Sequence, residues 1–164
     1  MSQLKIIGGH AIWTDRRTYP LRYAQFYRGI LEGLERSGKK GITVVDVGCN
    51  RGYATYELKN FVNSHGYQAV TIGIDVDKNI LKEAYTSGRI GHAILALAQG
   101  PLPFRDESVD VVVCNSLVEY FPLGDYLESK QEFERILKDD GMLFLNDPYP
   151  VNGWHRRKLR RRVL

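Results

Sequence analysis

Short apolar runs alternate with helical periodicities along most of the chain. The runs typical of strands cover residues 43–47, 69–74, 92–97, 109–114 and 142–146. Apolar positions at helical spacing predict helices over 21–37, 53–64, 78–87 and 125–138, with Asp77 as an N-cap. Glycine follows each predicted helix within a few residues, at Gly38, Gly66, Gly88 and Gly141. Residues 1–20, which contain Gly8-Gly9, show neither period, so we expect them to be irregular.

This order of elements predicts the fold class. Strands that alternate with helices are typical of a parallel sheet covered by helices. The run at 109–114 is nearly all valine, which indicates a strand buried on both faces. We therefore predict an α/β, Rossmann-like, doubly wound, mostly parallel sheet of about five strands with helices on both faces. In such a sheet, ligands bind in a crevice at the carboxyl ends of the strands.

The length of 164 residues fits one domain. We expect an N-terminal segment and helix over 1–41, a ligand-binding core over 42–147 and a tail over 148–164. No apolar run approaches the roughly 20 residues that span a bilayer, and the first residues do not resemble a secretory signal. We therefore expect a cytoplasmic protein without membrane contact. The two cysteines, Cys49 and Cys114, fit a reducing compartment and are too few for a metal cluster, so no metal site is expected.

Positive charge is concentrated in the tail. The basic residues there are Arg156, Arg157, Lys158, Arg160, Arg161 and Arg162. Removing these six from the 23 basic residues of the chain leaves 17, against 19 acidic ones. The run Arg156–Arg162 can attract RNA or another anionic partner, or it can be a solvated chain end.

A glycine-rich turn follows the first predicted strand of the core, in VVDVGCNRGY at residues 44–53. Gly48 permits a positive φ and close approach to the backbone, and the helix after Gly52 presents free N–H groups. Asp46 lies just before the turn, where it can accept hydrogen bonds from a cationic ligand or orient the loop. Asn50 tolerates left-handed backbone better than most residues. The alternative is a tight strand-to-helix turn without a ligand.

An acidic residue ends the next predicted strand, in IGIDVD at residues 72–77. The Asp75 carboxylate can accept hydrogen bonds from both hydroxyls of a ribose. The alternative is a turn aspartate, although Asp77 is the better candidate for a helix cap. Together, the two motifs favour an adenosine-containing ligand.

The order Asp46-x-Gly48-x-Asn50-x-Gly52 resembles the [DE]-x-G-x-G-x-G motif of class I S-adenosylmethionine (SAM) dependent methyltransferases, with asparagine for the central glycine. Residues 98–121 are similar to the G-D-A-x-x-L-P-F-x-x-x-S-F-D-x-V stretch of the type 11, ubiquinone/menaquinone-biosynthesis-like group. Leu102-Pro103-Phe104, Ser108 and Asp110 match it in register. The resemblance covers about residues 42–146.

The resemblance implies site residues. Asp75 corresponds to the ribose-binding acid and Val76 to the residue that packs on the adenine. Ala98 replaces the aspartate that accepts from the adenine amine, and the amide oxygen of Gln99 can accept that bond instead, unless Gln99 is only a solvated loop residue. The segment at Asn115 corresponds to the methyl-transfer site, where Asn115 can touch SAM or the acceptor. Glu119 and Tyr120 are the other acceptor-side candidates, or simply a strand-to-helix connection.

The chemistry implied is direct displacement of the SAM methyl group by an unidentified acceptor, which needs no nucleophilic residue. The resembling family has seven strands, and residues after Asn146 are too few for the last two. An open sheet edge is therefore expected, which a homodimer or a partner subunit can cover. Two other hypotheses are a catalytically silent methyltransferase-like subunit and a nicotinamide-dependent oxidoreductase. The missing G-x-G-x-x-G argues against the latter.

Overall fold

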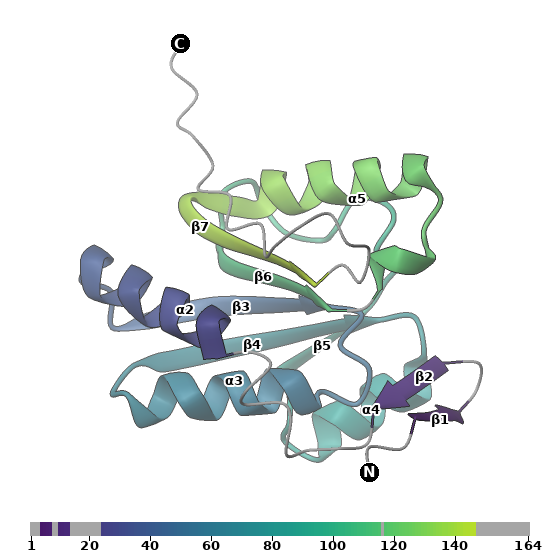
Figure 1. Ribbon diagram of the computed structural model, residues 1–164, viewed down its shortest axis with the longest axis horizontal. Helices are drawn as coiled ribbons and strands as arrows, with labels where there is room; N and C mark the ends of the chain where they lie inside the picture. Colours follow the sequence, from purple (N-terminus) through teal and green to yellow (C-terminus); the bar gives the residue numbers. More distant parts are fainter. Residues whose placement is uncertain (1–3, 8–9, 14–23, 116, 147–164) are drawn as a thin grey trace.

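The computed structural model describes residues 4–7, 10–13, 24–115 and 117–146. Its main feature is a parallel sheet with the strand order β5-β4-β3-β6-β7 (Figure 1). The strands are β3 (Gly41–Val47), β4 (Gln68–Asp75), β5 (His92–Leu95), β6 (Val109–Asn115) and β7 (Leu137–Asn146). The predicted five-stranded parallel sheet is confirmed.

Helices cover both faces of the sheet, as predicted. The helices are α2 (Ala24–Ser37), α3 (Tyr53–Ser64), α4 (Lys78–Thr86) and α5 (Leu123–Ile136), with a short 3₁₀ helix η1 (Val118–Tyr120) before α5. One buried cluster joins α2 and α3 to the sheet, and another joins α5 to the opposite face. Figure 1 shows α5 on one side of the sheet and α3 and α4 on the other.

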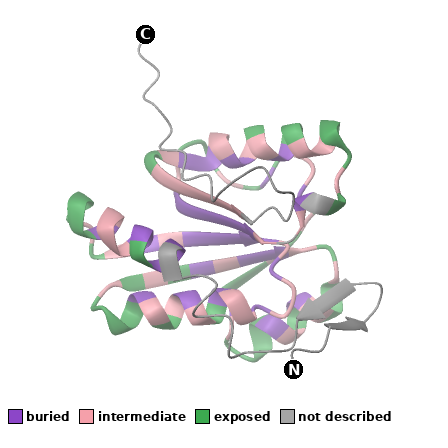
Figure 2. Ribbon diagram, viewed as in Figure 1, coloured by how far each residue is buried: buried purple, intermediate pink, exposed green. Residues whose placement is uncertain are grey.

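The alternation of side chains along the strands divides the core between these clusters. Val44 and Val111 belong to the α2–α3 side, whereas Val45 and Val112 belong to the α5 side. All residues of β6 from Val109 to Cys114 are buried, as a valine-rich central strand requires. Figure 2 shows burial concentrated on β3 and β6, two neighbouring inner strands of the sheet.

The N-terminal segment differs from the prediction. Residues 1–20 were expected to be irregular, but β1 (Leu4–Ile7) and β2 (His10–Trp13) form an antiparallel hairpin in which Ile7 pairs with His10. The physical reason is the two-residue Gly8-Gly9 connection between two apolar runs, a strong hairpin signal. Residues 14–23 lie outside the described part of the chain. The first residues of the helix predicted over 21–37 are among them.

The region between α5 and β7 also differs. The helix was predicted over 125–138, but it begins at Leu123 and ends at Ile136, and β7 begins at the next residue. Residues 139–141, which separate the predicted helix from the predicted strand, instead lie at an irregularity within β7. Val109 pairs with Leu137, and Val111 already pairs with Met142. The extra residues of β7 are accommodated at this bulge. β5 is shorter than predicted and ends at Leu95.

The topology places the strand order reversal at which such sheets usually bind ligands. From β3 the chain crosses to β4 on one side, and β6 pairs with β3 on the other. The connections after β3 and β6 therefore lead away from each other at the carboxyl ends of these neighbouring strands, which is the usual ligand crevice of such sheets.

Candidate functional site

A tight bend connects β3 to α3 at the carboxyl edge of the sheet. The backbone N–H groups of Gly48 and Cys49 donate to the Ile74 carbonyl over 2.8 and 2.9 Å, so the bend is tied to β4. Gly48, Asn50 and Gly52 have φ values of 74°, 50° and 72°. The prediction that Asn50 can adopt left-handed backbone is confirmed. The Asn50 side chain also accepts from the Arg51 N–H, which stabilises this conformation.

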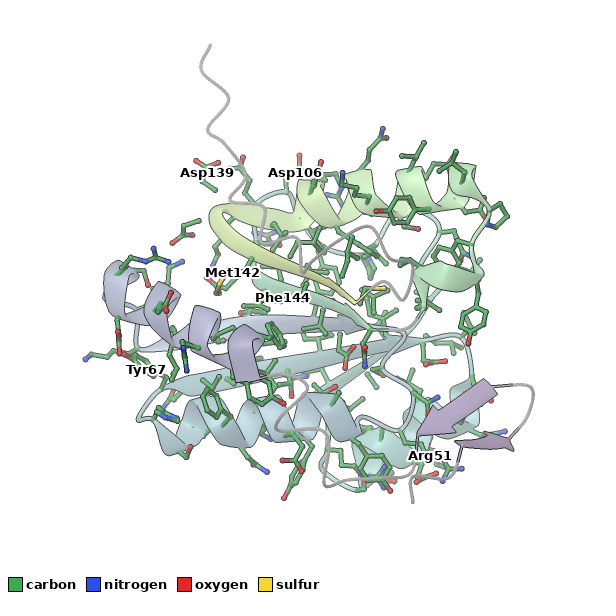
Figure 3. The ribbon with its side chains drawn as sticks, in the orientation of Figure 1. Arg51, Tyr67, Asp106, Asp139, Met142 and Phe144 are labelled. Carbon is green, nitrogen blue, oxygen red and sulfur yellow. The ribbon has the colours of Figure 1, made fainter. Side chains whose placement is uncertain are left out.

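The glycines of the bend allow close packing of protein neighbours. A Cβ on Gly48 would lie 2.8 Å from Leu117 Cδ2, and one on Gly52 would lie 3.0 Å from Ile90 Cγ2. Among the described residues, therefore, the close approach at Gly48 is made by the segment after β6. Arg51, labelled in Figure 3, forms an ion pair of 3.4 Å with Glu83 of α4.

Asp75 joins the bend to the end of β4. Its Oδ2 accepts from the Asn50 N–H over 2.8 Å, and its Oδ1 accepts from the Asp77 N–H over 3.0 Å. The neighbouring Val76 side chain is 57% exposed. Asp77 caps α4 as predicted, because its side chain accepts from the N–H groups of Asn79 and Ile80. The cap of α4 is thus a different residue from the candidate ribose acid. The bond from the Asp77 N–H also gives Asp75 the turn role that was the alternative.

Asp46 is buried beneath the bend. Its Oδ2 accepts from the hydroxyl of Thr55 in the first turn of α3. Burial raises the pKa of Asp46 to about 6, with a smaller contribution from the charge of Asp75, while the Thr55 bond acts in the opposite direction. Of the two roles predicted for Asp46, this geometry favours orienting the loop, because the carboxylate ties β3 to α3.

A small cavity lies next to Asp46, between the sheet and helices α2 and α3. Its volume is about 10 Å³, close to what one water molecule needs. The residues that line it are Phe26, Tyr27, Val44, Asp46, Ala54, Thr55, Leu58 and Val113. Such a space is far too small for a nucleoside, so the adenosine-sized ligand expected from the sequence needs the crevice above the strand ends.

The remaining predicted residues lie on two loops at the same edge. Ala98 is buried and Gln99 is half-buried in the loop after β5. Asn115, half-buried, ends β6 and pairs in register with Asn146. Tyr120 in η1 is 66% exposed. The Glu119 side chain is outside the described part of the chain, as are Ser116 and Arg156–Arg162 of the basic tail.

Comparison with known proteins gives the family. A profile described as a methyltransferase domain matches residues 45–145, well over half of the chain. The chain belongs to this methyltransferase family. A malonyl-[acyl-carrier protein] O-methyltransferase of Coxiella burnetii is 31% identical over 74% of this chain and 39% of its own length. A demethylmenaquinone methyltransferase of Desulfitobacterium hafniense is 33% identical over 64% of this chain and 42% of its own length.

Solved structures agree on the fold. A SAM-dependent methyltransferase of Leishmania major has a TM-score of 0.62 and 17% identity, and the similarity covers 77% of this chain and 49% of the other. The chain spans less than half the length of the curated relatives it matches.

The family match overturns the nicotinamide-dependent hypothesis and bears out the resemblance found in the sequence.

A direct-displacement methyltransferase needs no protein nucleophile. Cys114 is fully buried, and burial raises the pKa of its thiol, so it packs as a small apolar side chain. Within the described residues, no group of three or more His, Cys, Asp or Glu side chains is placed to hold a metal ion. No helix of the described part is long and apolar enough to cross a membrane.

Sequence reasoning missed one part of the site's surroundings. It selected the Leu102-Pro103-Phe104 segment but not its partners on α5, Glu132 and Arg135. A Glu and an Arg three residues apart on a helix are a common surface pair, so the spacing alone did not indicate that they hold a loop.

Proposed function

We propose that this chain is the catalytic core of a SAM-dependent methyltransferase whose cofactor lies in the crevice at the carboxyl ends of β3 and β4. In this proposal the adenosyl part meets Asp75, Val76 and the Ala98-Gln99 loop. The amino-acid part meets the Gly48–Gly52 bend and the N-terminus of α3, with Asp46 supporting the bend from below.

The observation that carries the proposal is the placement of Asp75. Each of its two carboxylate oxygens accepts one backbone hydrogen bond from a described residue. An ionised carboxylate has about four acceptor positions, so Asp75 keeps capacity for the two hydroxyls of a ribose. The exposed Val76 beside it offers an apolar surface for a purine ring. These residues fit the adenosyl part of SAM.

The N-terminus of α3 suits the other end of the cofactor. Gly52 is the N-cap, and the first-turn N–H groups of a helix have no partner within the helix. These groups and the helix dipole favour a carboxylate such as that of the methionyl part of SAM. No charged side chain of the bend is required for this contact.

SAM supplies an activated methyl group on a sulfonium, so the chain need only bind, orient and exclude water. In our proposal the acceptor approaches over the end of β6, next to the half-buried Asn115 and the exposed Tyr120. The identity of the acceptor is left open, because the curated relatives act on chemically different compounds, as their names state.

Calorimetric titration of the 164-residue chain with S-adenosylhomocysteine tests the proposal. We expect one-site binding, and we expect Asp75→Asn to raise the Kd by about 100-fold, because two charge-assisted hydrogen bonds weaken. Asp77→Asn is the matched control, since asparagine also caps helices well and the Kd should stay unchanged. Equal binding by both variants would overturn the proposal.

Asp75→Asn can also loosen the bend, so its melting temperature is measured alongside. Val76→Ser provides a second, less disruptive variant because this side chain is already exposed. We expect it to keep the melting temperature and to raise the Kd by roughly fivefold through lost apolar contact. No heat of binding by the unmodified chain would favour the catalytically silent alternative.

We further propose that the outer edge of β7 pairs with another chain. Among the described strands β7 pairs only with β6, so its other edge offers backbone groups to a partner. Light scattering is expected to give a mass above that of one chain or, with a partner subunit, a stable complex. The run Arg156–Arg162 is proposed to contact RNA or another anionic partner, with binding that weakens as salt increases.

A further inference from the structure

The loop between β5 and β6 carries the two residues proposed to meet the adenine, Ala98 and Gln99. It has little structure of its own. None of residues 97–101 makes a backbone hydrogen bond with another described residue, and Gly100 has a φ of 144°. The position of Gln99 must therefore be set by the points where the loop is attached on either side.

The first attachment is at the end of β4. The N–H of Ala96 donates to the carbonyl of Asp75 over 3.2 Å. The loop therefore starts from the residue proposed to bind the ribose, which fixes the distance between the ribose acid and the beginning of the loop.

The second attachment is made by side chains of α5. Glu132 Oε1 accepts from the Leu102 N–H over 2.6 Å, and Arg135 Nη2 donates to the Leu102 carbonyl over 3.1 Å. Both backbone groups of Leu102 are thus held by one helix, and the Leu102 side chain is buried in the core below. Arg135 Nη1 also donates to the Phe104 carbonyl over 3.0 Å.

The two helix residues are themselves paired. Arg135 Nη2 lies 2.5 Å from Glu132 Oε1, and Arg135 Nη1 lies 2.5 Å from Asp106 Oδ1. Figure 3 shows Asp106 beside α5. One guanidinium therefore binds two carboxylates and two carbonyls, a use of its planar array of donors that lysine cannot reproduce. The bonds from Arg135 and Leu102 lower the pKa of Glu132, although burial works against them.

The side chain of Gln99 is available for a ligand. It is half-buried, and no described residue hydrogen-bonds to its amide. Its oxygen can accept a hydrogen bond from an exocyclic amine, and its nitrogen can donate. To recognise that amine, the Gln99 amide must be held in place by a fixed loop backbone before the ligand binds.

We propose that Glu132 and Arg135 are positioning residues that hold the Ala98-Gln99 segment for recognition of the adenine amine. This inference rests on the proposed function. The pair touches neither the cofactor nor the acceptor in this scheme. It acts by fixing Leu102, three residues after Gln99, so that the ordering of the loop is complete before binding.

The test compares two ligands that differ only in the group that Gln99 reads. Dissociation constants are measured by calorimetry for S-adenosylhomocysteine and S-inosylhomocysteine, in which a carbonyl oxygen replaces the adenine amine. The unmodified chain is expected to prefer the adenosyl ligand by about tenfold or more, the worth of one hydrogen bond. Arg135→Met is expected to reduce this preference to about twofold, mainly by weakening adenosyl binding.

Control variants separate positioning from general stability. Lys130→Met removes the 3.8 Å pair with Glu134 on the same helix, which does not touch the loop, and should leave the preference unchanged. Arg135→Lys keeps the positive charge but not the planar array, so an intermediate preference is expected. Glu132→Gln retains an acceptor for the Leu102 N–H, so its preference for the adenosyl ligand should fall less than that of Arg135→Met. Melting temperatures show whether each variant is folded.

The outcomes distinguish this inference from the proposed function. If the unmodified chain binds neither ligand, the proposed function is wrong, and this inference falls with it. If the chain binds both ligands equally, or if folded Arg135→Met keeps the full preference, the positioning role is wrong while the cofactor site stands. A preference that falls in Arg135→Met and Glu132→Gln but not in Lys130→Met supports the role.

Discussion

Two aspartates at opposite ends of the sheet, Asp75 and Asp110, use the same chemical group differently. Asp75 lies at the carboxyl end of β4 and accepts one backbone hydrogen bond on each oxygen. Asp110 lies near the amino end of β6. Its Oδ1 accepts from Lys39 over 2.9 Å and from Lys138 over 3.0 Å, and its Oδ2 accepts from the Thr43 N–H over 2.9 Å.

The two aspartates differ in how far their acceptor positions are already used. Burial works to raise the pKa of Asp110, but the bonds from Thr43, Lys39 and Lys138 outweigh it, so the pKa is lowered overall. These bonds join the strands β3 and β6 to the bulge of β7. Asp75 has no cation among its hydrogen-bond partners in the described structure, and it lies at the carboxyl edge of the sheet, where we propose that SAM binds. Asp110 stabilises the sheet, whereas Asp75 keeps acceptor positions for the ribose that we propose it binds.

The largest expected effect comes from the structural aspartate. Asp110→Asn weakens the three hydrogen bonds that the buried carboxylate accepts, although Lys39 keeps its pair with Asp140. We expect the free energy of unfolding to fall by about 3 kcal/mol. The Kd for S-adenosylhomocysteine should not change. Urea denaturation and calorimetry measure the two quantities. A change in Kd without a loss of stability would contradict this account, because it would make Asp110 the ligand-binding aspartate.

A third aspartate, Asp46, adds a pH dependence. Its pKa is about 6 in the folded chain, against 3.8 for the free group. Because the folded state holds the proton more tightly, this group favours folding most below pH 4, and the contribution is lost as pH rises from about 4 to about 6. The loss is at most about 3 kcal/mol. Asp46→Asn should show less decline over this range in urea denaturation at several pH values. If stability depends on pH in the same way in Asp46→Asn and in the unmodified chain, Asp46 is not the source of this pH dependence.

We expect the Gly48–Gly52 bend, which lies between Asp46 and Asp75, to tolerate little change. Gly48→Ala places a Cβ in the left-handed region and 2.8 Å from Leu117 Cδ2. We expect a loss of about 2 kcal/mol in stability, from backbone strain and the displaced side chain, together with weaker cofactor binding. Gly66→Ala is a useful control, since its φ is also positive but nothing lies within 4 Å of the added Cβ. Equal losses would show that only the backbone conformation matters.

The smallest expected effect on stability is at Asp77, which lies two residues after Asp75 and caps α4. Asp77→Ala removes the N-cap of α4 and should lower stability by about 1 kcal/mol. Thermal unfolding measures this loss, and the Kd for S-adenosylhomocysteine should remain the same. A large rise in Kd would mean that the ligand contacts have been assigned to the wrong carboxylate.

Most of the sheet was predictable because strand and helix periods are local. The valine run of β6 and the glycine stop after α3 needed no tertiary information. The β7 bulge was not predictable, because it depends on how Leu137 and Met142 pair with β6. The hairpin of β1 and β2 was missed although its Gly8-Gly9 signal was present in the sequence.

The site was predictable to a different degree. Asp75, Asn50 and Gly48 were selected from motif spacing, and the structure brings them together because β3 and β4 are adjacent parallel strands. The sequence left open whether Asp46 faces a ligand or orients the loop, because burial decides between these roles. Glu132 and Arg135 were not found, since their partner, Leu102, is 30 or more residues away in the chain.

The most direct test of the central claim is a crystal structure of the chain with S-adenosylhomocysteine. Our account predicts both ribose hydroxyls within hydrogen-bonding distance of the Asp75 carboxylate, and the adenine against Val76. A ligand bound elsewhere, or a ribose turned away from Asp75, would contradict it.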